Sequence, residues 1–243
     1  MIKNLDTIAK GWKEVLNLAI SKIPTNYLNF LEQNSNWLPG KKSWLNAFSI
    51  PPEQVQFVLY GESPYPRAGS ANGYAFWDNA VNEIWSENGF SKQVNRATSL
   101  RNFLKMLLKA EEKVQDSENS CTNPLLLKPA TLHRVSTLKE VFINLLNHGF
   151  LLLNANLALT SLGKSKDYQA FLNFQREILK FLSLKNPKIK LILLGKFSEK
   201  IGELEEAKPF DKIVAEHPYN LSFINNNEMI DFFKTFNLLE KKY

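Results

Sequence analysis

The chain has 243 residues, of which 44% are hydrophobic and 22% charged, which is typical of a soluble globular protein of one large domain or two small ones. A single cysteine, Cys121, excludes an internal disulfide and any multi-cysteine zinc or iron–sulfur site, and no apolar run is long enough to cross a bilayer. The formal net charge of +6 is compatible with a polyanionic partner, because lysines that face phosphates gain from counterion release.

We expect residues 1–243 to form one domain in which residues 1–48 are helices that pack on the core. Apolar residues recur with a period near 3.6 from Leu5 to Leu31. Charged residues interrupt the apolar ones at the N-terminus, so this segment is expected to be a helix and not a signal peptide. Ser43 is expected to cap a further short helix.

The segment from residue 55 to residue 78 has the pattern of a buried strand that leads into a ligand-binding loop. An apolar, β-branched and aromatic run begins at Val55 and ends at Gly61, and a loop punctuated by proline and glycine follows. In α/β proteins, a buried strand delivers polar groups and backbone N–H groups to its carboxyl end in this way.

The segment that follows, residues 79–95, is polar and predicted to be irregular. An amphipathic helix is predicted from Thr98 or Ser99 as N-cap, and residues 113–135 are predicted to form a long loop, which is typically functional or mobile. Thr137 and Glu140 have the spacing of a capping box at the start of another helix.

Three more apolar runs alternate with helical patterns, and each run ends at a small or polar residue. The runs are residues 150–153 before Asn154, residues 189–194 before Gly195 and Lys196, and residues 212–216 before His217, and helices are expected at residues 167–184, 198–206 and 229–238. This alternation predicts an α/β fold with three αβα layers around a central four-stranded, mainly parallel sheet. Because the carboxyl ends of parallel strands lie at one edge, we expect the residues that follow the runs to converge there.

The motifs at these strand ends resemble those of the classical uracil-DNA glycosylase family. The motifs are GESPYP (61–66), GYAF (73–76), LLLNANLALT (151–160), LLLGK (192–196) and HPYNLS (217–222). Their order and spacing are similar to the family's GQDPYH, GLAF-like, LLLN-x-x-L-T, LLWG and HPSPLS segments, from about Trp44 to Ser222. The resemblance implies the fold of that family and an enzyme that hydrolyses the bond between uracil and the sugar of DNA.

The resemblance also implies roles for the residues that would hold the base. Asn154 matches the asparagine that reads the uracil edge, where an amide can donate and accept at once. Phe76 matches the aromatic ring that stacks on the flipped base, and Tyr65 matches the residue that excludes the methyl group of thymine. The alternatives are a strand-end asparagine that caps a turn and a phenylalanine that simply packs in the core.

His217 matches the histidine that stabilises the negative charge developing on the departing uracil. Leu221 matches the side chain that enters the base stack when the nucleotide flips out. Residues expected to contact DNA phosphates through hydroxyl groups and loop amides are Ser99, Ser222, Gly195 and Lys196.

One departure from the family concerns the catalytic aspartate of GQDPYH, whose position is occupied by Ser63. A serine can hold the attacking water but contributes no negative charge to the oxocarbenium-like sugar. Glu62, the adjacent carboxylate, is counted among the substrate-binding residues, although alternation along an extended segment would point it away from Ser63. The sequence therefore predicts slowed turnover and leaves open a catalytically weakened or silent homologue that binds DNA or acts as a scaffold.

The resulting hypothesis is a DNA-repair glycosylase that acts on uracil or a related damaged base in single- or double-stranded DNA. We expect it to need no metal or cofactor, to be a monomer, to have no membrane partner and to be cytoplasmic.

Overall fold

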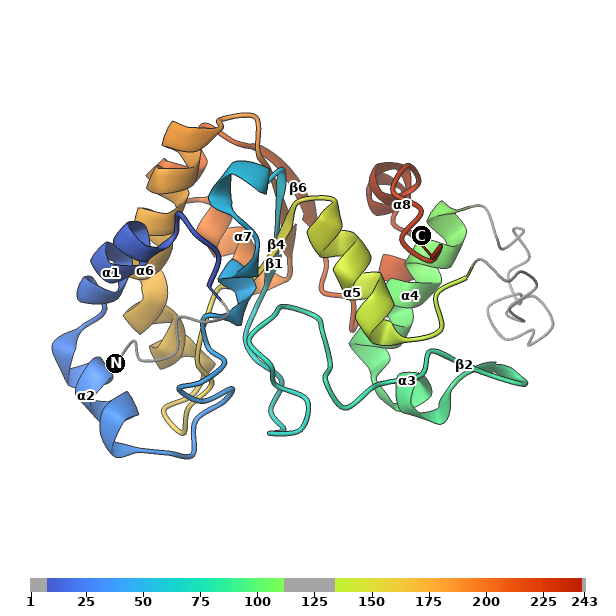
Figure 1. Cartoon of the computed structure of the whole chain (residues 1–243), viewed down its shortest axis with the longest axis horizontal. Helices are drawn as coiled ribbons and strands as arrows, with labels where there is room; N and C mark the ends of the chain where they lie inside the picture. The colour runs from blue at the N-terminus through green and yellow to red at the C-terminus, as the bar shows by residue number, and fades with distance from the viewer. Residues whose placement is uncertain (1–7, 112–133, 242–243) are drawn as a thin grey trace. The chain divides into compact units, whose positions relative to one another are not determined.

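A computed structural model describes residues 8–111 and 134–241 of the chain (Figure 1). Cys121 and almost all of the predicted loop at 113–135 lie outside the described residues. The chain divides into two compact units. We call Met1–Phe76 with Gly149–Val214 the sheet unit, and Trp77–His148 with Ala215–Tyr243 the helical unit. That the two units act as one domain stays a prediction.

The sheet unit is built on four strands, because four apolar runs of the sequence lie side by side and the first three of them are buried. The strands are β1 (Phe57–Gly61), β4 (Phe150–Asn154), β5 (Lys190–Leu194) and β6 (Asp211–Ala215), in the order β4-β1-β5-β6. The central strand β1 pairs in parallel with both of its neighbours, with Gly61 opposite Asn154. All five residues of β4 are buried.

The order of the strands shows that the chain changes direction once as it crosses the sheet. From β1 to β4 the chain steps one way across the sheet, and from β4 to β5 and on to β6 it steps the other way. The predicted α/β class and its layered arrangement around a four-stranded sheet are therefore confirmed.

Within residues 8–76 and 149–214, the sheet unit also contains four α-helices, of which α1 and α6 run side by side (Figure 1). The helices are α1 (Lys13–Ser21), α2 (Thr25–Gln33), α6 (Lys164–Lys185) and α7 (Lys196–Gly202), with short 3₁₀ helices η1 (Asn46–Ser49), η2 (Pro52–Gln54) and η4 (Glu205–Ala207). Trp12, just before α1, is fully buried against the rings of Phe48 and Phe181. That residues 1–48 as a whole pack as helices on the core of one domain stays a prediction.

In the part that the structure describes, the helical unit has a small hairpin and four α-helices. Its elements are β2 (Trp85–Ser86), β3 (Gly89–Phe90), α3 (Lys92–Arg96), α4 (Thr98–Ala110), α5 (Leu138–Asn147), the 3₁₀ helix η5 (Leu221–Asn225) and α8 (Asn227–Phe233). The capping box at Thr137 and Glu140 is confirmed, since each side chain bonds the other residue's backbone N–H. Among the residues that the structure describes, no helix has the length and apolar character needed to span a membrane.

Three local predictions were wrong. Ser43 lies in a turn before η1 and caps no helix, because the chain continues as a single 3₁₀ turn. Ala97, and neither Thr98 nor Ser99, is the N-cap of α4. Residues 79–95 are not irregular throughout, since they contain the hairpin of β2 and β3 and most of α3.

Candidate functional site

The carboxyl ends of β1 and β4 bring Asn154 and Phe76 to the same point. A Cβ atom placed on Gly61 would lie 2.6 Å from Oδ1 of Asn154, 3.1 Å from Cβ of Ala75 and 3.4 Å from Cε2 of Phe76. Gly61 thus allows the amide and the aromatic ring to approach the backbone of β1 closely. An amide beside an aromatic ring, at the edge where parallel strands end, can hydrogen-bond and stack on a planar heterocycle.

The loops that follow β1 and β4 remain paired beyond the strands. The N–H groups of Ala155 and Asn156 donate to the carbonyl oxygens of Gly61 and Glu62, at 2.8 and 3.0 Å. The backbone N–H of Ala75 donates to Leu152 O at 3.0 Å, which fixes the segment that carries Phe76 against β4. These bonds hold the backbone at the site in one geometry.

The backbone of Asn154 is hydrogen-bonded by Gln175 of α6. Gln175 was not identified from the sequence. Gln175 is fully buried, and its Nε2 donates to the carbonyl oxygens of Asn154 and Ala155, each at 3.0 Å. Its Oε1 accepts a hydrogen bond from the Tyr60 hydroxyl at 3.1 Å. Gln175 follows Phe171 by four residues, so it lies on the apolar face of α6. A polar residue on an apolar helix face is the sequence signal that could have identified Gln175.

Phe76 adopts a backbone conformation that is unusual for a residue with a side chain, with φ of +62°. The Tyr65 hydroxyl donates to its carbonyl oxygen at 3.0 Å. Left-handed backbone costs a non-glycine residue free energy, so the surrounding bonds must maintain it. The predicted pocket residues Tyr65 and Phe76 are thereby brought together.

Ser63 and Glu62 lie in the loop directly after β1, and both are half-buried. Oε2 of Glu62 lies 3.4 Å from Nζ of Lys164, at the start of α6. An ion pair with one partner about half exposed is weak, so it orients Glu62 more than it stabilises the fold.

Gly195 and Lys196 lie at the start of α7, after β5. Gly195 is the residue before the helix, with φ of +92°, and Lys196 is exposed. The Ser198 hydroxyl donates to Gly195 O at 2.7 Å. Positive φ at this turn explains the glycine.

In the helical unit, His217 follows β6 and its ring is oriented by a backbone hydrogen bond. The N–H of Tyr219 donates to Nδ1 of His217 at 3.1 Å. A ring nitrogen that accepts a hydrogen bond carries no proton, so in the neutral imidazole Nε2 carries the proton and is the donor. His217 can therefore donate a hydrogen bond to an oxygen atom that becomes negative.

The backbone after His217 is hydrogen-bonded by Asn102 of α4. This is a second residue that was not identified from the sequence. Asn102 is buried, and its Nδ2 donates to Pro218 O at 2.8 Å and to the carbonyl oxygens of Tyr219 and Asn220 at 3.4 Å. Leu221 follows at the start of η5, and its side chain is 70% exposed. An exposed leucine on a fixed loop has the form expected of a side chain that enters a base stack.

The two serines predicted to contact DNA also lie in the helical unit. Ser99 is half-buried in the first turn of α4, and Ser222 is exposed in η5. The Ser222 side chain is hydrogen-bonded to Glu216, whose Oε2 also accepts from Nδ2 of Asn226 at 3.1 Å. Partial burial raises the pKa of Glu216, but these bonds and its own backbone N–H lower it further, so the pKa lies below the ordinary value.

The predicted site residues thus fall into two sets. The sheet unit holds Asn154, Phe76, Tyr65, Glu62, Ser63, Gly195 and Lys196, and the helical unit holds His217, Leu221, Ser222 and Ser99. That the two sets form one site stays a prediction. Across residues 8–111 and 134–241, no three His, Cys, Asp or Glu side chains are grouped so that they could bind a metal ion.

Comparison with solved structures identifies the class of this protein. A wild-type UNG crystal structure from Nitratifractor salsuginis superposes with a TM-score of 0.89 and 33% sequence identity, over 98% of this chain and 95% of that one. The mimivirus uracil-DNA glycosylase is similar in fold, with a TM-score of 0.58 and 16% identity over 88% of this chain and 71% of that one. The fold is therefore that of a uracil-DNA glycosylase-like α/β protein.

Sequence comparison gives a shorter match. A curated uracil-DNA glycosylase from Thermobifida fusca (strain YX) is 33% identical over 75 residues, which is 29% of this chain and about a third (32%) of that protein. No family model matches the chain. The near-complete alignment at 33% identity with the Nitratifractor structure places the chain in the uracil-DNA glycosylase family.

Proposed function

We propose that this protein hydrolyses the N-glycosidic bond of uracil, or of a related damaged base, in DNA. The observation that carries the proposal is the position of Asn154 Oδ1 and the Phe76 ring beside Gly61, at the carboxyl end of β1. Membership of the uracil-DNA glycosylase family supports it, as do the names of the related proteins. The proposed partner is uracil-containing DNA, single- or double-stranded, and the proposed working form is a cytoplasmic monomer.

Each residue has a role that follows from its chemistry. The Asn154 amide donates to and accepts from the uracil edge, and Phe76 stacks on the flipped base. Tyr65 excludes the methyl group of thymine by closing the pocket beside C5 of the base. Leu221 fills the gap that the base leaves in the stack.

His217 acts at the departing base. As the bond to the sugar breaks, its electron pair moves onto uracil, and Nε2–H of His217 donates to the O2 atom that becomes negative. A water molecule held at Ser63 adds to the sugar carbon and releases a proton to solvent. The products are free uracil and an abasic site.

The alternative is a catalytically weakened or silent homologue that binds DNA or acts as a scaffold. Two observations favour it: Ser63 provides no negative charge, and the neighbouring Glu62 carboxylate is bound to Lys164. An oxocarbenium-like sugar is stabilised by a nearby carboxylate, so its loss slows the reaction.

The test is release of free uracil from single-stranded and duplex oligonucleotides that contain one deoxyuridine. The unaltered protein should release uracil, and Asn154→Ala should reduce the release strongly while a uracil-free DNA is still bound. If no uracil is released even with protein in excess over DNA for several hours, the proposal is wrong. Salt-dependent DNA binding without an abasic product would then identify the silent homologue.

A further inference from the structure

Tyr219 is more exposed to solvent than any other aromatic residue that the structure describes. Its side chain is 67% exposed, and Leu221, two residues later, is 70% exposed. Every other aromatic side chain in residues 8–111 and 134–241 is buried or half-buried. A large aromatic surface in water is unfavourable by itself, so its place beside a second exposed apolar side chain points to a ligand.

The loop that presents Tyr219 is fixed, although the ring itself is free of the core. Asn102 grips the carbonyl oxygens of three successive residues, including that of Tyr219. The backbone N–H of Tyr219 donates to His217, and Asn220 N donates to His217 O at 2.9 Å. A ring on a fixed backbone loses little conformational entropy when it binds, which favours it as a contact residue.

Helices α3 and α4 carry positive charge and no negative charge, whereas α8, which follows η5, carries Glu228 and Asp231. Between residues 91 and 110, the charged side chains are Lys92, Arg96, Arg101, Lys105 and Lys109. Arg101, Lys105 and Lys109 are spaced four residues apart along α4, so they lie on one side of that helix. Nζ of Lys109 donates to Oδ1 of Asn225 at the end of η5, at 2.6 Å, which joins the basic side of α4 to the loop.

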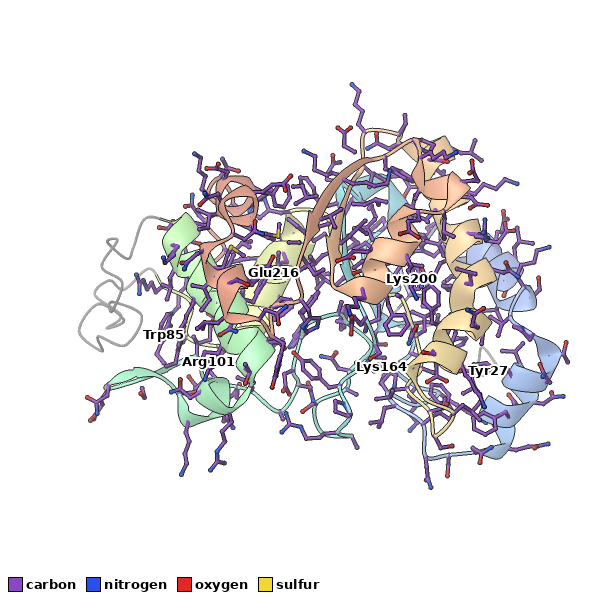
Figure 2. All side chains as sticks on the ribbon, turned by 180° about the vertical axis from the view of Figure 1, so that it is seen from behind. Tyr27, Trp85, Arg101, Lys164, Lys200 and Glu216 are labelled. Carbon is purple, nitrogen blue, oxygen red and sulfur yellow. The ribbon has the colours of Figure 1, made fainter. Side chains whose placement is uncertain are left out.

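Figure 2 labels Arg101 on α4 and Glu216 at the end of β6. The guanidinium of Arg101 donates to Asn95 O at 3.1 Å. The Glu216 carboxylate accepts from Ser222 and Asn226, so this nearby negative charge is already partnered. The surface formed by η5 and α4 is thus suited to a ligand that has both negatively charged groups and exposed planar rings.

We propose that Tyr219 is a base-stacking residue for single-stranded DNA, contacting a base next to the nucleotide that Leu221 displaces. The proposal rests on the proposed function and adds a contact, and a preferred DNA form, to it. Bases within an intact duplex stack on each other, whereas bases of a single strand are available to a side chain that already lies in solvent. Lysines and arginines of α3 and α4 would neutralise the phosphates of the same strand.

The experiment is equilibrium binding by fluorescence anisotropy, at one fixed salt concentration. The probes are a fluorescein-labelled single-stranded oligothymidylate and a labelled duplex of equal length, neither of which contains uracil. The variants are Tyr219→Ala and Tyr219→Phe, and the matched control is Leu184→Ala, because Leu184 is 80% exposed on α6 of the sheet unit.

Tyr219→Ala should weaken single-strand binding by roughly tenfold, because one base stack on an aromatic ring contributes that much or more. Tyr219→Phe should retain the affinity, and Leu184→Ala should bind as the unaltered protein does. The duplex should respond to Tyr219→Ala by about twofold or less.

Equal single-strand affinity for Tyr219→Ala and the unaltered protein would overturn the proposal, as would equal losses on both probes or a loss shared by Leu184→Ala. Because the probes contain no uracil, this outcome is independent of whether the protein releases uracil. A protein that releases uracil but binds single strands equally well without Tyr219 contradicts this inference alone. A silent protein whose single-strand binding needs Tyr219 contradicts only the proposed glycosylase activity.

Discussion

The backbone N–H of Tyr219 donates a hydrogen bond to Nδ1 of His217 across 3.1 Å. This contact leaves Nε2 as the donor of the neutral ring. The chemistry proposed for His217 therefore needs no proton transfer to the ring before the reaction.

Replacing His217 by Leu should slow uracil release by about 10²–10³, because one preorganised donor to a developing oxyanion is lost. Leucine has a similar volume but no donor, so DNA affinity should change little. Single-turnover kinetics and anisotropy on the same protein separate the two effects. A loss of affinity that matches the loss of rate would show that His217 serves binding and not the chemical step.

Ser63→Asp should accelerate uracil release, because it restores negative charge beside the oxocarbenium-like sugar. An increase on the order of 10²–10³ is expected from one well-placed electrostatic group. Ser35→Asp is the control, since Ser35 is an exposed serine of the sheet unit and adds the same charge elsewhere. No increase with Ser63→Asp would indicate that the rest of the pocket cannot hold the base.

Gly61→Ala should abolish uracil release while the protein remains folded. The added Cβ would lie 2.6 Å from Oδ1 of Asn154, so the amide must move out of its position. Gly69→Ala is a matched control in the loop that follows β1, because a Cβ on Gly69 would meet no atom within 4 Å. Circular dichroism confirms folding, and uracil release with Gly61→Ala equal to that of Gly69→Ala contradicts the assignment of Asn154.

Gln175→Leu should lower the free energy of unfolding by about 1–3 kcal/mol, because two buried carbonyl oxygens and the Tyr60 hydroxyl lose their partner. Urea denaturation measures this change, with Gln33→Leu at the exposed end of α2 as control. The folded variant should also bind free uracil more weakly, since Gln175 fixes the backbone of Asn154. A destabilised variant with unchanged uracil affinity would limit Gln175 to a structural role.

The capping box of α5 predicts a pH dependence of stability. Partial burial raises the pKa of Glu140, but hydrogen bonds from the Thr137 and Ser136 N–H groups and the Thr137 hydroxyl lower it further, so the pKa is below its ordinary value. The stabilisation is therefore complete above the ordinary carboxyl pKa and is lost as pH falls through the folded value. Glu140→Gln should be less stable than the unaltered protein at pH 7, and thermal melts should show this difference shrinking below about pH 4. A constant difference across that range would contradict the assignment.

Local patterns were enough to predict the four strands of the sheet unit and most helices, but they missed the hairpin of β2 and β3. β1, β4 and β5 are short apolar runs bounded by glycine or a polar residue, and burial on both faces produces that pattern directly. Gly61, Asn154 and His217 were predicted to lie at strand ends for the same reason. Element boundaries were less accurate: α6 begins at Lys164, three residues before the predicted start.

The residues that hold the site in place could not be predicted, because their contacts join distant parts of the chain. Asn102 bonds Pro218 across 116 positions, and Gln175 bonds Asn154 across 21. A single buried amide within an apolar helix face indicates that some partner exists, but only the folded structure shows which backbone it supports. Ser43 failed as a helix cap for the opposite reason, since a local preference was overridden by the turn that follows it.

Phe76 combines an unfavourable backbone conformation with the proposed role of stacking on the base. Its left-handed backbone, with φ of +62°, would suit glycine or asparagine better, yet either residue would remove the ring beside Asn154. Substitution of Phe76 should therefore separate stability from base recognition. Phe76→Gly should relieve the backbone strain, while the base would lose the ring on which it is proposed to stack. Selection for thermal stability alone should therefore favour replacement of Phe76, whereas selection for base recognition should favour phenylalanine at this position.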